Sequence, residues 1–177
     1  MRLSSLMKAA LSALFPVVLV HELGNILIML LFGAHPTRLK ATLSGFEIDY
    51  LGIISDKQEM ITALAGPTLG LLFSLLCANF GQVWGSDYLL MCAGLGFVIY
   101  FFNFLPEKPL DGGRVLSFAL CVLLGEYKSR PILRFVDLLT TILLLVSGLY
   151  FIAKDLGFAL FFAGIWLMIL QQNISCK

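Results

Sequence analysis

The chain has 177 residues, of which 59% are apolar and only 13% are charged. A soluble domain carries about a quarter charged residues and somewhat less than half apolar ones. The composition, with a mean hydropathy of +0.95, therefore excludes a water-soluble enzyme and indicates a single integral membrane domain over residues 1–177. Twelve Lys and Arg residues against eleven Asp and Glu residues leave no basic patch for a nucleic-acid partner.

Apolar runs dominate the chain, and a helix needs roughly 20 residues to cross the hydrocarbon core. The fourth run is too short to cross alone, and it follows a polar stretch at 106–114 with two prolines and two glycines. Such a break at membrane depth is tolerated only where it faces packed protein or a cavity. We therefore predict an all-α polytopic bundle of five to six transmembrane segments with one discontinuous helix. The runs are residues 9–32, 60–80, 88–105, 115–124, 133–153 and 156–170.

Positive charge favours five crossings over six, because Lys and Arg gather on the cytoplasmic side of membrane proteins. If residues 88–124 form one discontinuous crossing and the N-terminus lies outside, the cytoplasmic side carries seven Lys and Arg residues and the outer side three. Six crossings with the N-terminus inside divide these charges six to six.

The segment after the first apolar run has a different pattern. Phe46, Ile48 and Tyr50 alternate with acidic residues, and a serine–glycine pair precedes them. A period of two beside a glycine turn predicts a small β-hairpin on the cytoplasmic side. An ordinary polar loop with accidental alternation is the open alternative.

Three ionisable residues lie in or beside the apolar runs. His21 and Glu22 fall near the middle of the first run, where an ionisable pair costs several kcal/mol unless it is paired, hydrated or bound to a metal. Asp111 lies in the helix break, between a proline and two glycines. An imidazole and a carboxylate are both acceptable zinc ligands, and Glu22 could take a proton from metal-bound water. The alternatives are a His–Glu pair bonded to a neighbouring helix and an Asp111 that only caps a turn.

These residues belong to three motifs that resemble those of site-2-type intramembrane metalloproteases. The motifs are H-E-L-G at 21–24, A-G-P at 65–67 and N-F-L-P-E-K-P-L-D-G-G-R at 103–114, in the family's order and spacing. Within that family, the motifs resemble those of the bacterial branch that processes sporulation transcription-factor precursors. The resemblance covers residues 17–116, the three-helix catalytic core of the family.

The resemblance implies a zinc peptidase that cuts transmembrane segments of membrane-tethered regulators inside the bilayer, in a bacterial cytoplasmic membrane. Carried onto this chain, His21 and Asp111 are ligands of one zinc ion and Glu22 is the general base. Asn103 lies in the stretch that contacts substrate in the family. Separate regulatory proteins are expected, because the chain carries no soluble regulatory domain.

The predicted hairpin supplies the remaining candidate substrate residues. Main-chain pairing with a strand edge is a common way to hold an extended peptide. Phe46, Ile48 and Tyr50 are therefore assigned to substrate binding.

Two positions depart from the family pattern. The family's first motif is H-E-x-x-H, whose two histidines share one helical face, but residue 25 is Asn. Asn25 is kept as a weak third ligand, because an amide oxygen is neutral and hard whereas zinc favours imidazole or thiolate. His35 is roughly 21 Å from His21 along a continuous helix, so it cannot replace the missing ligand unless the chain folds back sharply. Gly70 stands where the family usually has an asparagine.

Two further functions stay open. The first is a catalytically silent relative that binds transmembrane segments without cutting them. The second is a small proton-coupled transporter in which His21, Glu22 and Asp111 relay protons. The transporter ranks last, because such folds have broken helices in corresponding halves and this sequence shows one break.

Overall fold

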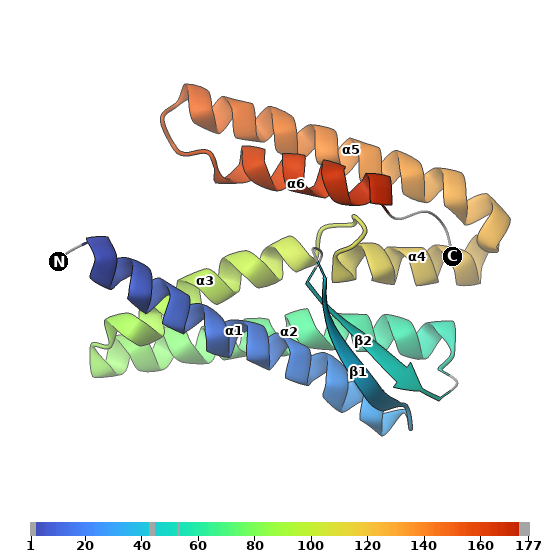
Figure 1. Ribbon diagram of the computed structural model, residues 1–177, viewed down its shortest axis with the longest axis horizontal. Coiled ribbons are helices and arrows are strands. Elements are labelled where there is room, and N and C mark those ends of the chain that lie inside the picture. The colour runs from blue at the N-terminus through green and yellow to red at the C-terminus, as the bar shows by residue number, and fades with distance from the viewer. Residues whose placement is uncertain (1–2, 43–44, 53, 174–177) are drawn as a thin grey trace.

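The computed structural model describes residues 3–42, 45–52 and 54–173, and the side chains of 3–6, 39–48 and 171–173 lie outside that description. This part of the chain forms six helices and one two-stranded sheet, as predicted (Figure 1). In chain order the elements are α1 (Leu3–Leu31), β1 (His35–Thr42), β2 (Gly45–Leu51), α2 (Asp56–Trp84), α3 (Asp87–Asn103), α4 (Asp111–Leu124), α5 (Glu126–Ala153) and α6 (Ala159–Asn173).

Helices α1, α2 and α3 pack against one another and enclose the core of the molecule. Ser55 caps the start of α2 with a capping box. Its hydroxyl accepts from the backbone N–H of Gln58, and the side-chain oxygen of Gln58 accepts from the backbone N–H of Ser55. Gly85 ends the helix in the left-handed conformation, and α3 then runs back along α2. The buried core residues are Ala13, Val17, Cys77, Cys92, Ala93 and Tyr100.

The predicted hairpin is confirmed, and it is longer than the alternating residues alone. Strands β1 and β2 pair antiparallel from His35 opposite Leu51 to Thr42 opposite Gly45. The first strand was not predicted, although Leu39 and Ala41 alternate with Arg38 and Lys40 in its second half. The hairpin contacts α1, and β2 leads into the start of α2.

The predicted helix break before the fourth apolar run is also confirmed. Helix α3 ends at Asn103, and α4 begins at Asp111 after a short loop (Figure 1). A Cβ atom on Gly112 would lie 2.3 Å from the carbonyl oxygen of Phe104, and one on Gly113 would lie 2.3 Å from the carbonyl carbon of Glu107. The two glycines therefore let the loop fold back onto the first turn of α4, which fixes the position of Asp111.

Helices α5 and α6 form a pair that joins the rest of the chain through α4 and the loop. Thr141 of α5 donates a hydrogen bond of 2.8 Å to Glu107 in the loop, which is fully buried. The backbone of Lys108 donates to Asp137 of α5 at 3.3 Å. The loop that precedes Asp111 is thus held from one side by α4 and from the other by α5.

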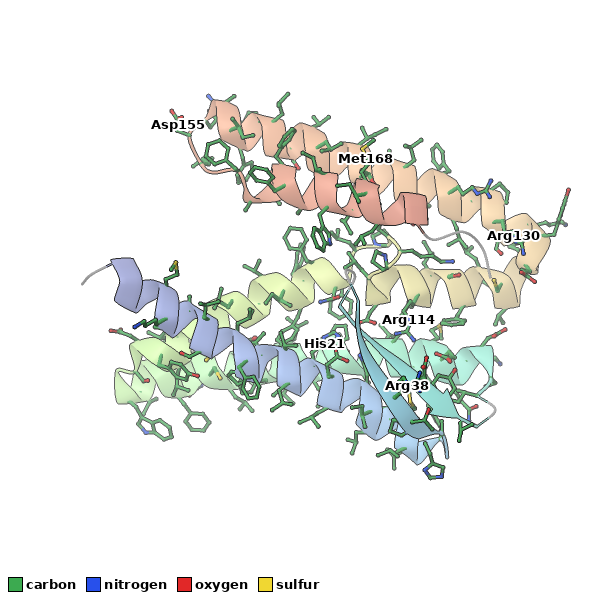
Figure 2. All side chains as sticks on the ribbon, in the orientation of Figure 1. His21, Arg38, Arg114, Arg130, Asp155 and Met168 are labelled. Atoms are coloured by element: carbon green, nitrogen blue, oxygen red, sulfur yellow. The ribbon has the colours of Figure 1, made fainter. Side chains whose placement is uncertain are left out.

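Three helices are long and apolar enough to cross a membrane: α1 from Met7, α2 and α5. Helix α3 and residues 159–170 of α6 are shorter apolar helices. Charged residues such as Arg130 and Asp155 lie near opposite ends of α5 (Figure 2). These features, with large exposed apolar side chains along the helices, are those of an integral membrane protein. Five crossings and their orientation stay predictions.

Candidate metal and substrate site

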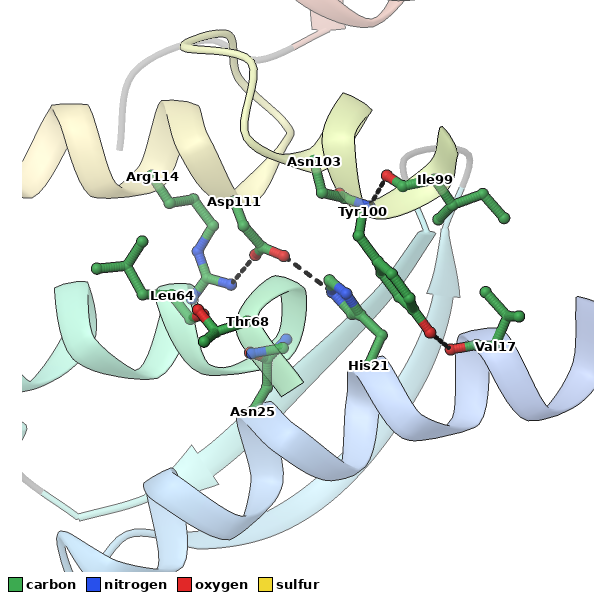
Figure 3. Close-up of polar contacts among 11 residues, drawn as sticks. Val17, His21, Asn25, Leu64, Thr68, Ile99, Tyr100, Asn103, Asp111 and Arg114 are labelled. Carbon is green, nitrogen blue, oxygen red and sulfur yellow. Dashed lines mark hydrogen bonds and ion pairs between the residues drawn. The ribbon is translucent and has the colours of Figure 1, made fainter. Parts of the chain in front are cut away.

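His21 and Asp111 meet in the structure, although 90 residues separate them in the sequence. Nε2 of His21 lies 2.9 Å from Oδ2 of Asp111, and both side chains are about nine-tenths buried (Figure 3). Asp111 stands in the first turn of α4, where the helix dipole favours a negative charge. The helix break therefore places the Asp111 carboxylate inside the bundle, against His21 of α1, while the predicted role of both residues as metal ligands stays a prediction.

Asn25 lies one turn beyond His21 on the same face of α1 and is 6% exposed. Its Oδ1 accepts a hydrogen bond of 2.8 Å from the backbone N–H of Gly66 in α2. A Cβ atom on Gly66 would lie 2.6 Å from that oxygen, so only glycine leaves room for the amide. Asn25 thus ties α1 to α2 at the A-G-P motif.

Glu22 and Asn103 lie around this pair without a hydrogen bond to it. Glu22 is half-buried on α1 and lies within electrostatic reach of His21, Asp111 and Arg114. Asn103 is half-buried at the end of α3, and its amide nitrogen donates to the carbonyl oxygen of Ile99 at 3.0 Å. Both side chains are near the candidate site, but their predicted roles in catalysis and substrate binding stay predictions.

Tyr100 supports His21, a role that the sequence did not indicate. Its ring lies parallel to the imidazole, with centroids 6.0 Å apart, and its hydroxyl donates to the carbonyl oxygen of Val17 at 2.6 Å (Figure 3). A Cβ atom on Gly70 would lie 2.3 Å from the Tyr100 ring. The glycine that departs from the family pattern therefore makes room for this tyrosine.

Arg114 and Glu59 extend the polar site toward the start of α2. Nη1 of Arg114 lies 3.4 Å from Oδ1 of Asp111, and Nη2 lies 3.3 Å from Oε2 of Glu59. Arg114 belongs to the third motif, which assigns it no role, and no motif in the sequence marks Glu59. Its only local signal is an acidic residue in the first turn of a helix, which is common.

Of the three hairpin residues assigned to substrate binding, the structure places one side chain. The hydroxyl of Tyr50 donates a hydrogen bond to Oε1 of Glu59. The side chains of Phe46 and Ile48 lie outside the described residues. Tyr50 therefore faces the start of α2, and a direct contact with substrate stays a prediction for all three.

The donor set does not fit the three-ligand zinc centre that the resemblance implies. Among the described residues, no three His, Cys, Asp or Glu side chains gather around one point. His21 and Asp111 lie at hydrogen-bond distance, closer than the roughly 3.4 Å that separates two ligands of a tetrahedral zinc ion. Nδ1 of His21 is buried and has no hydrogen-bond partner in the part of the chain that the structure describes, whereas a zinc-bound histidine normally donates its second N–H to an acceptor. The third position offers only the Asn25 amide oxygen, which already accepts from Gly66.

Comparison with known proteins supports the fold. No protein-family model matches the chain, and no curated protein matches its sequence. Among solved structures, the chain is similar to the site-2 protease from Methanocaldococcus jannaschii, with a TM-score of 0.73 and 21% sequence identity. The likeness covers 96% of this chain and 79% of that one. The chain therefore has the fold of that protease, in agreement with the relationship that its three motifs predict.

Proposed function

We propose that this chain uses a site-2 protease fold to bind transmembrane segments of other membrane proteins without cutting them. The observation that carries the proposal is Asn25, which stands at the second histidine of the H-E-x-x-H pattern and is hydrogen-bonded to the backbone of Gly66. The fold is kept, and the donor set for zinc is incomplete.

The loss of one imidazole weakens zinc binding more than a change in the surroundings of the ligands does. Altering a group that only supports a zinc ligand already lowers affinity by about 10–100-fold. Replacing a ligand itself costs at least as much. Asn25 would also have to give up or share its contact with Gly66 before its oxygen could reach an ion.

The polar residues around His21 suit a segment whose helix is partly unwound. In the membrane, every free backbone N–H and C=O needs a partner, because no water is present to supply one. Glu22 and Asn103 are half-buried polar side chains at the edge of the candidate site. Strand β2 supplies backbone groups of the kind that pair with extended peptides. The partner proposed is therefore a transmembrane segment with a weak helix, in the membrane that holds this chain.

A zinc-dependent peptidase is the second candidate, and one observation favours it. His21 and Asp111, the two residues that the motif resemblance assigns as ligands, lie in contact, and Glu22 follows His21 directly. In that case His21 and Asp111 would hold the ion and Glu22 would act as general base. An amide oxygen as third ligand favours a harder ion than zinc.

A photo-crosslinking experiment tests the binding proposal. The probe is a synthetic leucine-rich helix of roughly 20 residues with a central Gly-Pro pair, reconstituted with the protein in lipid vesicles. A photoreactive amino acid replaces Leu51 at the end of β2, and the matched control carries it at Tyr127 at the start of α5. Both positions are well exposed, at 68% and 91%. We expect capture of the probe at position 51 and not at 127, and equal or absent capture at the two would contradict the proposal.

The same vesicles separate the two candidates. We expect no cleavage of the probe by the wild-type chain, with or without added zinc. Cleavage that disappears in Glu22→Gln would establish the peptidase instead.

A further inference from the structure

Five side chains from four elements form one continuous line of contacts between the hairpin and His21. Tyr50 of β2 donates to one oxygen of Glu59, and the other oxygen of Glu59 pairs with Arg114 at 3.3 Å. Arg114 also contacts Oδ1 of Asp111 at 3.4 Å, and Oδ2 of Asp111 lies 2.9 Å from His21. In both Glu59 and Asp111, one carboxylate oxygen contacts the preceding residue of the line and the other oxygen contacts the next residue.

Arg114 can hold both carboxylates because its guanidinium presents donors in a fixed planar fork. Glu59 and Asp111 are both buried, so each needs a cation or hydrogen-bond donors to offset the loss of hydration. Nη1 and Nη2 of Arg114 serve one carboxylate each. The orientation of Asp111 toward His21 therefore depends on where Arg114 is held, and Glu59 holds it.

Tyr50 connects this arrangement to the hairpin. It lies near the end of β2, opposite Pro36 of β1, and its hydroxyl reaches the first turn of α2. If the hairpin moves, Glu59 loses a donor and is free to change its contact with Arg114. A movement of the strand pair can then change the position of the Asp111 carboxylate, because Arg114 contacts both Glu59 and Asp111.

We propose that Glu59 and Arg114 are positioning residues that hold the Asp111 carboxylate against His21, and that Tyr50 makes this arrangement depend on the hairpin. The functional meaning rests on the proposed function, because the hairpin is the element to which we assign the bound segment. A segment that pairs with β2 and displaces Tyr50 changes the His21–Asp111 contact without touching either residue.

Nitrogen NMR of His21 tests the proposal directly. The chain has two histidines, so a His35→Gln background labelled with [15N]histidine gives the signals of His21 alone. In this background we expect the His21 ring signals to shift in three variants, and the shift to decrease along the line of contacts. The largest shift is expected for Arg114→Gln, a smaller one for Glu59→Gln and the smallest for Tyr50→Phe.

The control is Tyr88→Phe, which also removes a tyrosine hydroxyl bonded to another element. Tyr88 donates to the carbonyl oxygen of Ser12 in the first half of α1, away from Glu59. We expect no shift of the His21 signals in this variant. If Tyr50→Phe moves the His21 signals no more than Tyr88→Phe does, the proposal is wrong.

The measurement needs no bound segment, so its failure is distinct from a failure of the proposed function. Tyr50→Phe removes one oxygen atom from a half-buried side chain and is expected to fold. It decides the question alone if Arg114→Gln or Glu59→Gln does not fold.

Discussion

Replacing Gly70 by alanine is expected to destabilise the helix bundle, because Tyr100 already occupies the space that a Cβ atom needs. The new atom would lie 2.3 Å from Cε1 and 2.4 Å from Cζ of that ring. Carbon atoms in ordinary contact are about 3.5 Å apart, so the ring would have to move by roughly 1 Å. Tyr100 is fully buried, so its ring cannot move into solvent.

The size of the effect follows from three contributions. Overpacking of a buried site costs about 1–3 kcal/mol. Movement of Tyr100 also breaks its hydrogen bond to Val17, which contributes about 0.5–1.5 kcal/mol. Alanine in place of glycine favours the helix by up to about 1 kcal/mol, which offsets part of the loss. The net decrease in the free energy of unfolding is therefore about 0.5–4.5 kcal/mol.

The assay is SDS-induced unfolding in detergent micelles, followed by circular dichroism. Gly94→Ala is the matched control, since Gly94 lies on α3 like Tyr100 and a Cβ atom there meets nothing within 4 Å. This variant is expected to be neutral or more stable by up to about 1 kcal/mol. The reasoning is refuted if Gly70→Ala is as stable as Gly94→Ala.

Two further substitutions test contacts of the site and of its supporting loop. Gly66→Ala is expected to lower the free energy of unfolding in the same assay, because its Cβ atom would lie 2.6 Å from Oδ1 of Asn25. A variant as stable as wild type would show that the Asn25–Gly66 contact does not hold α1 against α2. Thr141→Val removes the hydroxyl that donates to buried Glu107 and is expected to lower the free energy of unfolding by about 1–3 kcal/mol. A loss below roughly 0.5 kcal/mol, the scale of a surface substitution, would contradict the role given to α5 in holding the loop.

Much of the fold could be predicted from the sequence because local patterns determine it. Apolar runs predicted the helices, and the Pro- and Gly-rich stretch predicted the break before Asp111. The alternation around residues 46–50 predicted β2 but not β1. In strand β1, Leu39 and Ala41 alternate with Arg38 and Lys40, but this stretch is short and follows a proline, and its pairing with β2 appears only in the structure.

The candidate site was predictable only where a motif marked it. His21 and Asp111 stood out because ionisable residues are costly in apolar sequence. Tyr100 looked like any other apolar residue of α3, since its role depends on the absence of a side chain at Gly70. Glu59 lies 55 residues from Arg114, and no periodic pattern reports a contact of that separation. Such contacts come from packing between helices.

The central claim is that Asn25 leaves this site-2 protease fold without a complete zinc site. The most direct test is the zinc content of the purified protein by mass spectrometry, for wild type, Asn25→His and Asn25→His combined with Asp111→Asn. The account predicts only background zinc in wild type, near-stoichiometric zinc in Asn25→His, and its loss in the double variant. Near-stoichiometric zinc in the wild-type chain, removed by His21→Ala or Asp111→Asn, would contradict the account.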